Sequence, residues 1–564
     1  MKRYLLISFA LVLCIGINAQ LSTNEQPFSF RLSSKKLNDM KSSLHRVTMP
    51  ALDMAKIEAE DKEDEEYDMP PRFGFPHFVD YDLTNSGTWY ELPDGDKLWQ
   101  LNVVCPGALS VNFCYDKFWI PEGGKFFVYS KDRKHCIGAF TSRNNKGDSI
   151  HVRGFATGLV NGNDVILEYY QPKEVSSKAI ISIDYVVHGY RYINFKDKSI
   201  GDAGSCMVNI NCEEGQNWQY EKRAVARILI EGVYYCSGSL IATTDLSGKP
   251  FFLTADHCIE NHGDAAGNNN LDYTLFYWNF EAPGCTNVNL LTLNSTVGAT
   301  ILANNSMSDF ALLRLTEDPI NLSCFSPFYL GWDCSGEAGT PGVCIHHPKG
   351  DVKKISTVKT QPISFNLYYD PQYDETFWKV YWKSTLNGHG VIEQGSSGSP
   401  LLTASHKVIG QAYGGTASDC DHLNGYTYYG KIDVSWNGYG NDSICRRLNC
   451  WLDSLNNGLQ TMEGLLMIST SETMNADQQL YSNIRITSRG QFIIQSDVEL
   501  MGNSRMIVDS GGKLIINGGS LSNVDLVLKP GASLQIINNG IIETRNGFNA
   551  PVGAIVNVAY GQII

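Results

Sequence analysis

Three short stretches of the sequence carry residue types that together could cleave a peptide bond. Ser397 lies in "EQGSSGSPL", His257 follows the apolar run in "FFLTADHCIE", and Asp309 precedes the apolar run in "SMSDFALLRL". A serine hydroxyl is a weak nucleophile unless a base takes its proton and a third group orients that base. Each residue alone has a simpler explanation, because serine is common in turns and a histidine or aspartate often ends a strand. Only their combination points to catalysis.

The order along the chain, His257 then Asp309 then Ser397, is that of the chymotrypsin-like clan. "GSSGSP" also fits the nucleophile loop of that clan, with Ser397 as the attacking residue. Gly395 lets the chain turn so that the backbone N–H groups of Gly395 and Ser397 can point at one oxygen, as an oxyanion hole requires. We therefore interpret the three side chains as a catalytic triad.

A longer series of motifs resembles the lysyl endopeptidase group of bacterial trypsin-like proteases. Over residues 201–456 the sequence contains, in this order, "GSCMVNINC", "CSGSL", "FFLTADHC", "YWNF", "SDFALLRL", "GWD", "IHHPKG", "QGSSGSPLL", "IGQAYGG" and "VSWNGYG". The resemblance implies two six-stranded β-barrels with the active site between them. It also implies the disulfides Cys206–Cys420, Cys212–Cys285 and Cys236–Cys258. It assigns no partner to Cys105, Cys114, Cys136, Cys324, Cys334, Cys344, Cys445 and Cys450.

The resemblance also indicates where the P1 side chain of a substrate would bind. The wall of that pocket would be Tyr413, Gly414 and Gly415, whose backbone can pair with an extended substrate. Trypsin and the lysyl endopeptidases each carry an acid at the base of the pocket, and the matching positions here are Val391 and Thr427. An uncharged pocket would leave a lysine ammonium without a partner, which is costly.

Two further positions depart from the lysine-specific pattern. Tyr413 and Tyr368 stand where the lysine-specific enzymes carry histidine and tryptophan. Asp419, Asp421 or Glu393 could still supply negative charge to the pocket from a different direction. A neutral preference and a basic preference at P1 therefore both stay open.

Composition and cysteine use limit the other function classes. The net charge of −14 argues against nucleic-acid binding, which needs a basic surface. No cysteine or histidine pattern has zinc spacing, and His346 and His347 are adjacent, so their side chains would rarely share one ion. Serine chemistry needs no cofactor, and we expect neither a cofactor nor a metal.

The N-terminus predicts export. Residues 1–20 combine two basic residues, an apolar run and a small residue near Ala19, as a secretory signal peptide does. Cys14 would be a lipidation site only if the bulky Leu13 before it were tolerated. No later stretch is apolar enough for a transmembrane helix. We expect a secreted or cell-envelope protein in which disulfides can form.

The remaining chain divides into three parts. Residues 21–200 are predicted to be a propeptide, with a solvated acidic linker ("AKIEAEDKEDEEYDMPP") before a β domain that contains the hairpin "KFFVYSKDRKHCIGAFTSRNN". Residues 201–456 form the protease domain. In residues 457–564, Gly511 and Gly531 are 20 residues apart, as are Leu514 and Leu534. This period predicts a small β-solenoid-like domain, and the fold class of the whole chain is mostly β.

Ser396 indicates how the enzyme is activated. Many chymotrypsin-like enzymes have an acid at this position that binds a new N-terminal ammonium, and a serine cannot do so. The Cys206–Cys420 link would shape the cleft instead, in a zymogen cut within "NFKDKSIGDAG" so that the mature chain starts near Gly201.

The sequence thus predicts a secreted serine endopeptidase made as a zymogen. It would act on proteins or peptides as a monomer, through an acyl-enzyme on Ser397. The alternative is a catalytically idle protease fold that serves as a surface binding or adhesion protein.

Overall fold

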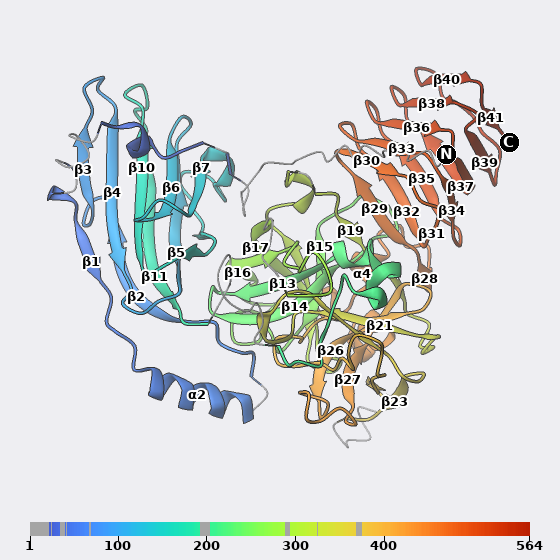
Figure 1. Cartoon of the computed structure of the whole chain (residues 1–564), viewed down its shortest axis with the longest axis horizontal. Coiled ribbons are helices and arrows are strands. Elements are labelled where there is room, and N and C mark those ends of the chain that lie inside the picture. Colours follow the sequence, from blue (N-terminus) through green and yellow to red (C-terminus); the bar gives the residue numbers. More distant parts are fainter. Residues whose placement is uncertain are drawn as a thin grey trace, which may run out of the picture.

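The computed structural model describes residues 22–23, 25–33, 40, 42–66, 69–191, 203–287, 294–323, 325–367 and 375–564. The predicted signal peptide, the start of the mature chain at Gly201, Tyr368 and Cys324 lie outside the described residues. The regular secondary structure consists mostly of strands, as the sequence predicted, in three groups that follow one another along the chain (Figure 1). No helix in the described part of the chain is long and apolar enough to cross a membrane.

The N-terminal group consists of two sheets that bury aromatic and branched side chains between them. The predicted hairpin is present as β6 paired with β7. The first sheet has the order β1-β4-β10-β6-β7, with β3 on β4, and its strands are β1 (Arg46–Thr48), β3 (Thr88–Glu91), β4 (Lys97–Val104), β6 (Lys125–Ser130), β7 (Cys136–Phe140) and β10 (Asp164–Gln171). The second has the order β2-β11-β5-β8, with β9 on β5, and its strands are β2 (Gly74–Asp82), β5 (Ser110–Trp119), β8 (Phe155–Ala156), β9 (Val160–Asn161) and β11 (Ile180–Gly189).

The sequence suggested a solvated linker or loop before β2, and this acidic run forms helix α2 (Met54–Glu66), most of whose residues are exposed. The run is rich in Ala, Glu and Lys, which favour helices. At its start the Lys56 N–H donates to the Asp53 carboxylate at 3.2 Å. One turn later Lys56 and Glu60 form an i,i+4 ion pair at 3.7 Å.

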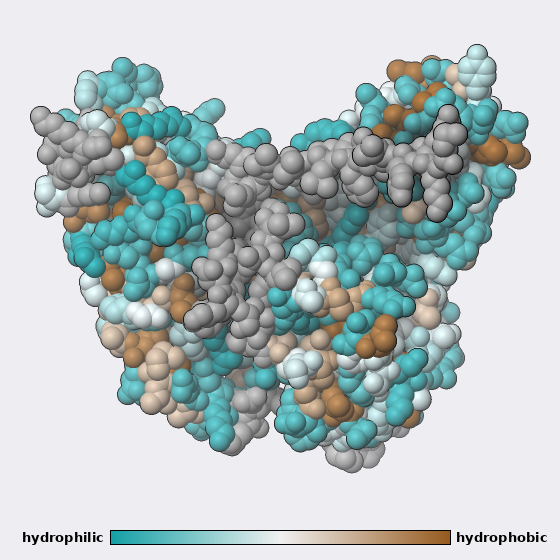
Figure 2. All heavy atoms as spheres, in the orientation of Figure 1, coloured by the Kyte–Doolittle hydropathy of each residue, from teal (hydrophilic) through white to brown (hydrophobic). Residues whose placement is uncertain are grey.

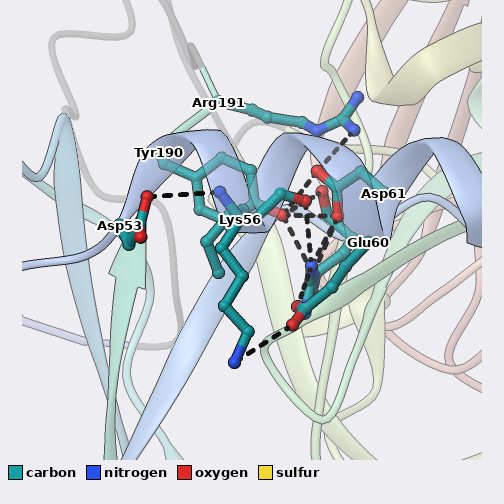
Figure 3. A network of polar contacts seen from close by, with 8 residues as sticks. Asp53, Lys56, Glu60, Asp61, Tyr190 and Arg191 are labelled. Atoms are coloured by element: carbon teal, nitrogen blue, oxygen red, sulfur yellow. Dashed lines mark hydrogen bonds and ion pairs between the residues drawn. The ribbon is translucent and has the colours of Figure 1, made fainter.

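The acidic face of α2 contacts Arg72, which follows the helix, and two residues that are distant in sequence, Tyr190 and Arg191 (Figure 3). Arg72 Nη2 lies 3.1 Å from Glu60 Oε2 and 2.8 Å from Asp61 Oδ1. The Tyr190 hydroxyl donates to Asp61 at 2.8 Å, and Arg191 pairs with it at 3.0 Å. Charges that look like a solvated run in the sequence are thus used to attach the helix to the sheets.

The central group contains a closed six-stranded barrel in the order β13-β14-β15-β18-β17-β16. Its strands are β13 (Val225–Ile230), β14 (Tyr234–Leu240), β15 (Phe251–Ala255), β16 (Asn270–Tyr277), β17 (Ser295–Asn305) and β18 (Phe310–Leu315). Beside it lies a sheet of ten strands, where the resemblance implied a second barrel of six. Four short strands account for the difference, two at the ends of the sheet (β12 and β23) and two beside β26 (β20, which pairs with β26, and β28, which pairs with β20). Their bounds are β12 (Val208–Asn209), β20 (Gly331–Asp333), β23 (Ile363–Phe365) and β28 (Thr461–Met462).

The other six strands of this sheet carry or support the candidate site. They run in the order β22-β21-β25-β26-β27-β24. Their bounds are β21 (Pro341–His346), β22 (Lys354–Thr357), β24 (Phe377–Val380), β25 (Pro400–Thr403), β26 (Lys407–Gly415) and β27 (Thr427–Lys431). Short helices connect the central strands: η3 (Glu213–Trp218), η4 (Glu221–Arg223), η5 (Pro319–Asn321), η6 (Pro348–Gly350), α3 (Ile432–Asn437), η8 (Gly438–Gly440), η9 (Ile444–Arg446) and α4 (Asn449–Leu452).

The tail is a stack of parallel strands, as its 20-residue period predicted. Leu514 of β36 pairs in register with Phe492 of β33 and with Leu534 of β38, and all three are buried. One sheet contains β30 (Ser471–Met474), β33 (Gln491–Ile494), β36 (Lys513–Asn517), β38 (Ser533–Ile537) and β40 (Ile555–Ala559). The other contains β19 (Phe328–Tyr329), β29 (Gly464–Ile468), β31 (Gln478–Leu480), β32 (Ser482–Ile486), β34 (Asp497–Leu500), β35 (Arg505–Val508), β37 (Ser520–Leu528), β39 (Ile541–Thr544) and β41 (Gln562–Ile563).

The two ends of this stack differ. At its start, β29 pairs with β19, and Lys407 forms an ion pair with Glu463 at 2.9 Å, so the tail is attached to the central group. At the other end, Ile555 and Val558 of β40 are exposed, and Figure 2 shows apolar surface at this end of the molecule.

Candidate active site

The loop before β25 places Ser397 between two glycines that no other residue could replace without strain. Gly395 has φ +84°, and a Cβ there would lie 3.2 Å from the Gly350 nitrogen. Gly398 has φ +81°, and a Cβ there would lie 2.2 Å from Thr254 Oγ1. The loop is thereby pressed against the end of β15, which leads directly to His257, while the Ser397 side chain stays partly exposed.

Hydrogen bonds fix the direction of the peptide units in this loop. The Gln394 carbonyl accepts from the Lys349 N–H at 2.6 Å, and the Ser396 carbonyl accepts from the Ser399 N–H at 3.0 Å. In a planar trans peptide the N–H points opposite to the carbonyl. The N–H groups of Gly395 and Ser397 therefore point away from these contacts, and neither has an acceptor within the described part of the chain. Two free donors are what a developing oxyanion requires.

Asp309 holds the backbone and the ring of His257 at the same time. Its Oδ1 accepts from the His257 N–H at 2.9 Å, and its Oδ2 lies 2.8 Å from His257 Nδ1. Asp309 has φ +54°, a conformation that short polar residues tolerate better than others, and only 4% of its side chain is exposed. Because Nδ1 is held by the carboxylate, Nε2 is the nitrogen that remains for a proton from a serine.

The charges around His257 favour its protonated form. Burial opposes the imidazolium, but the Asp309 charge and hydrogen bond outweigh burial, with smaller contributions from Glu260 and Asp256. The pKa of His257 is therefore raised above its ordinary value. Such a histidine can hold the proton that it takes from a nucleophile.

No hydrogen bond joins the Ser397 hydroxyl to the imidazole among the described residues, and such contacts often tighten only when substrate binds.

Ser396, which stands where many chymotrypsin-like enzymes have an acid, is hydrogen-bonded to a buried histidine. His346 Nδ1 lies 2.8 Å from Ser396 Oγ, and Nε2 lies 3.1 Å from Ser356 Oγ. Ser356 donates its own proton to the Val391 carbonyl at 2.9 Å, so Nε2 must donate to Ser356 and Nδ1 must accept from Ser396. Burial, with the Lys354 charge, lowers the pKa of His346 to about 3, so this network is neutral.

Ser237 is a positioning residue that the sequence interpretation missed. Its hydroxyl donates to the Gly395 carbonyl at 2.8 Å, and its N–H donates to the Ser397 carbonyl at 2.9 Å. The same hydroxyl accepts from the His347 N–H at 3.0 Å. The motif "CSGSL" drew attention to this strand, but nothing local indicated that Ser237 holds the nucleophile loop.

His346 and His347 are fully buried and serve hydrogen bonding. No group of three or more His, Cys, Asp or Glu side chains in the described ranges is arranged to hold a metal.

Disulfides join the three cysteine pairs that the resemblance implied. Cys236–Cys258 links β14 to the residue directly after His257, and Cys212–Cys285 links two loops. Cys206–Cys420, with a Cα–Cα distance of 5.6 Å, ties the segment that follows Gly201 to the loop after β26. The cysteines at positions 105, 114, 136, 334, 344, 445 and 450 are unpaired in the structure.

The predicted pocket residues lie on neighbouring strands. In β26, Gly414 pairs with Tyr428 and Gly415 pairs with Thr427. The Tyr413 ring lies edge-on to the His257 ring, with centroids 5.6 Å apart, so this part of β26 borders His257. A Cβ on Gly414 would meet no atom within 4 Å, which leaves space beside the strand.

The two positions at the predicted base of the pocket have no exposed side-chain surface. Val391 and Thr427 are both 0% exposed. Trp382, which the sequence interpretation did not single out, packs in one apolar cluster with Val391, and its Nε1 donates to Thr427 Oγ1 at 2.9 Å. A neutral indole–hydroxyl hydrogen bond is thus present at the position where the resemblance implied an acid in the lysyl endopeptidases.

The three acids left open as sources of pocket charge have different surroundings. Glu393 accepts from the Gly204 N–H at 3.1 Å and pairs with Lys349 at 3.6 Å. Its carboxylate therefore already has a cationic partner other than a substrate side chain. Asp419 is bonded to His422 at 2.7 Å on the surface, and Asp421 is exposed.

Comparisons with known proteins match the central part of the chain to proteases. Residues 200–430 match the family model described as lysyl endopeptidase, C-terminal domain. The lysyl endopeptidase of Pseudomonas aeruginosa is 29% identical over 281 residues, which are 47% of this chain and 57% of that protein. The chain thus spans little more than half the length of this curated relative.

Two solved protease structures also match part of the chain. The Rv3671c protease in its inactive form has a TM-score of 0.24 and 18% identity over 37% of this chain and 84% of that one. A Glu endopeptidase in complex with MPD has a TM-score of 0.24 and 17% identity over 41% of this chain and 92% of that one. Over residues 200–430 the chain is similar to the C-terminal domain of lysyl endopeptidases, as the motif resemblance predicted.

Proposed function

We propose that residues 201–456 form a serine endopeptidase that acts on proteins or peptides. The observation that carries the proposal is the pair of hydrogen bonds that the Asp309 carboxylate accepts from the N–H and the Nδ1 of His257, at 2.9 and 2.8 Å, beside a loop with two free N–H groups. This arrangement combines an oriented base with preorganised oxyanion donors.

The roles of the residues follow from these contacts. Ser397 Oγ attacks the substrate carbonyl carbon as its proton moves to His257 Nε2, and the Gly395 and Ser397 N–H groups bind the oxyanion. The imidazolium, stabilised by Asp309, then gives the proton to the leaving amine, and the acyl group stays on Ser397. Water, deprotonated by His257, hydrolyses this acyl-enzyme.

The surroundings of Thr427 favour an uncharged P1 residue. A lysine ammonium at the Trp382–Thr427 pair would meet an indole and a hydroxyl, and Glu393 is held by Gly204 and Lys349. A buried cation without a carboxylate is costly. We therefore favour a neutral preference over the basic preference of the similar enzymes.

The same proposal includes export by residues 1–20 and a zymogen cut near Gly201. It is supported by the disulfides, which form in oxidising compartments, and by the Cys206–Cys420 link, which retains the new N-terminal segment beside the cleft.

The experiment compares the cut protein with its Ser397→Ala variant, using a fluorophosphonate probe and a mixed peptide library read by mass spectrometry. The wild type should bind the probe at Ser397 and cut mainly after uncharged residues, and the variant should do neither. Cuts mainly after lysine or arginine would overturn the P1 assignment. A wild type that neither binds the probe nor cuts peptides would overturn the proposal that the protein is a protease. It would favour the alternative of a binding protein.

A further inference from the structure

The N-terminal module, defined here as residues 72–191, shares one apolar core with the first barrel. Buried barrel side chains pack in the same cluster as the module's own core, among them Leu229, Val233, Tyr235, Leu275, Tyr277 and Val297. From the module, Phe113, Phe155 and Val187 belong to this cluster and are fully buried. Domains joined by a large apolar interface behave as one body, unlike domains with small polar contacts.

Buried charges close the rim of this interface. Lys146 Nζ donates to the Asp272 carbonyl at 3.0 Å and lies 3.6 Å from Asp272 Oδ1, with side chains 3% and 6% exposed. Arg153 donates to Asp272 Oδ1 at 2.9 Å, and Asn144 donates to Glu317 at 3.3 Å. Breaking one partner away from a buried ion pair leaves an uncompensated charge, which is strongly unfavourable.

Backbone contacts also cross the boundary. The Phe73 N–H donates to the Val233 carbonyl at 2.6 Å, and the Tyr235 N–H donates to the Pro71 carbonyl at 3.0 Å, in the manner of an added strand. The Tyr185 hydroxyl donates to the Glu231 carbonyl at 2.8 Å. Gly154 is so close that a Cβ on it would lie 2.6 Å from the Tyr273 ring.

The module covers the barrel away from the catalytic residues. Its partners lie on β13, β14, β16 and β17, and in Figure 1 it lies on the side of the barrel opposite to the tail. No hydrogen bond or ion pair in the described part of the chain joins residues 72–191 to His257, Asp309 or Ser397. The contacts that hold the module to the barrel are therefore made by residues other than these three.

We propose that the N-terminal module stays bound to the barrel after the chain is cut, as a non-covalent subunit of the active enzyme. This inference rests on the proposed function only for the existence of a cut between residues 191 and 203. Release of the module would uncover a contiguous apolar face on the barrel, which soluble monomers rarely expose.

The test uses the full chain with Ser397→Ala, and with the cleavage site of an unrelated specific protease placed between residues 191 and 203. The folded protein is cut and passed through size exclusion with light scattering at low micromolar concentration. We expect a single peak with the mass of the whole chain. The protein in that peak should give two bands on a denaturing gel. Two separate peaks would overturn the proposal. Because the cut is made externally in an inactive variant, the result does not depend on protease activity.

A matched pair of variants tests the interface itself. Asp272→Ala should raise the dissociation constant of the cut complex at least tenfold, because Lys146 and Arg153 lose their partner. Asp148→Ala, on the loop of the module that carries Lys146 and Arg153, removes an exposed carboxylate whose contacts are with Ile150 and His151 of that loop, and should leave the constant unchanged. Equal constants for both variants and the parent would mean that the interface is not the one described, and would overturn the proposal.

Discussion

The backbone N–H of Gly204 donates to both carboxylate oxygens of Glu393 at 3.1 Å, and Glu393 lies four residues before Ser397. Its side chain is 1% exposed, and Lys349 Nζ lies 3.6 Å away. Its own carbonyl accepts from the Ser396 N–H at 3.0 Å. The segment around Gly204 is thereby attached to the loop that carries Ser397.

Replacing Glu393 should loosen this loop. Glu393→Gln keeps one acceptor for Gly204 but loses the ion pair with Lys349, so the oxyanion donors should be less well placed. We expect kcat/KM to fall about tenfold to a hundredfold, mostly through kcat, because small misplacements of catalytic groups are costly. Asp419→Asn, which changes a surface carboxylate near Cys420, serves as the control. Equal kcat/KM for Glu393→Gln and the parent would refute the link.

Asp309→Asn should preserve the fold and remove most of the activity. Asparagine tolerates the φ of +54° at this position, so the backbone needs no rearrangement. The amide cannot stabilise an imidazolium, and it favours the wrong tautomer of His257. A fall in kcat of about 10⁴-fold is expected, as for the same change in other triads. Circular dichroism should be unchanged, and a loss of less than tenfold would argue against this role for Asp309.

The pH profile should report the raised pKa of His257. Activity needs the neutral imidazole, so kcat/KM should rise with pH through that pKa, on a limb whose midpoint lies above the ordinary value of 6.5. Glu260→Gln removes an exposed negative charge that favours the imidazolium, so the limb should move to lower pH, and less so at high salt. Glu213→Gln, which removes another exposed carboxylate, is the control. A limb that moves to higher pH in Glu260→Gln would contradict the electrostatic explanation.

What the sequence could predict depends on how local each signal is. The Gly395–Gly398 loop and the pairing of Leu514 with Leu534 follow from short motifs or a fixed period, because their causes lie within a few residues or one repeat. The links from Ser396 to His346 and from Glu393 to Gly204 join residues that are far apart, and no local pattern marks them.

The helix α2 was missed for the same reason. Its acidic residues suggested a solvated segment, and Tyr190 and Arg191, which bind Asp61, lie 129 and 130 residues further along the chain. The ten-stranded sheet of the central group likewise contains strands of two or three residues, such as β12 and β28, which the sequence did not predict. These strands are too short for any periodic signal.

A carboxylate at Thr427 should restore a preference for lysine. Thr427→Asp can still accept the Trp382 hydrogen bond and would place a charge where the pocket now has a hydroxyl. We expect the ratio of cuts after lysine to cuts after uncharged residues to rise at least tenfold in a peptide library. Thr427→Val, which removes the hydroxyl without adding charge, should not raise it. Denaturant unfolding checks that the buried aspartate is tolerated, and a folded Thr427→Asp with an unchanged ratio would place the pocket elsewhere.

The affinity of the N-terminal module for the barrel should decrease as pH rises, because of the titration of Glu317. Burial raises its pKa to about 7, although Lys146 opposes this shift, as do the hydrogen bonds from the Val297 N–H and Asn144. Separation of the module would remove Asn144 and Lys146 and admit water, so the pKa would fall toward the ordinary value of 4.5. The intact complex therefore holds a proton that the separated parts release.

Association should accordingly be strongest below about pH 4.5 and weaken up to about pH 7, by at most about tenfold per pH unit from this one group. Dissociation constants of the externally cut complex at pH 5, 6 and 7 measure the effect, and Glu317→Gln should reduce the slope. Burial also raises the pKa of Glu231 to about 7, beside Asp272, Lys146 and Asp184. Glu231 is present in the parent and in Glu317→Gln, so its contribution to the pH dependence cancels when the two slopes are compared. A slope that is the same in Glu317→Gln as in the parent would show that the module does not cover Glu317.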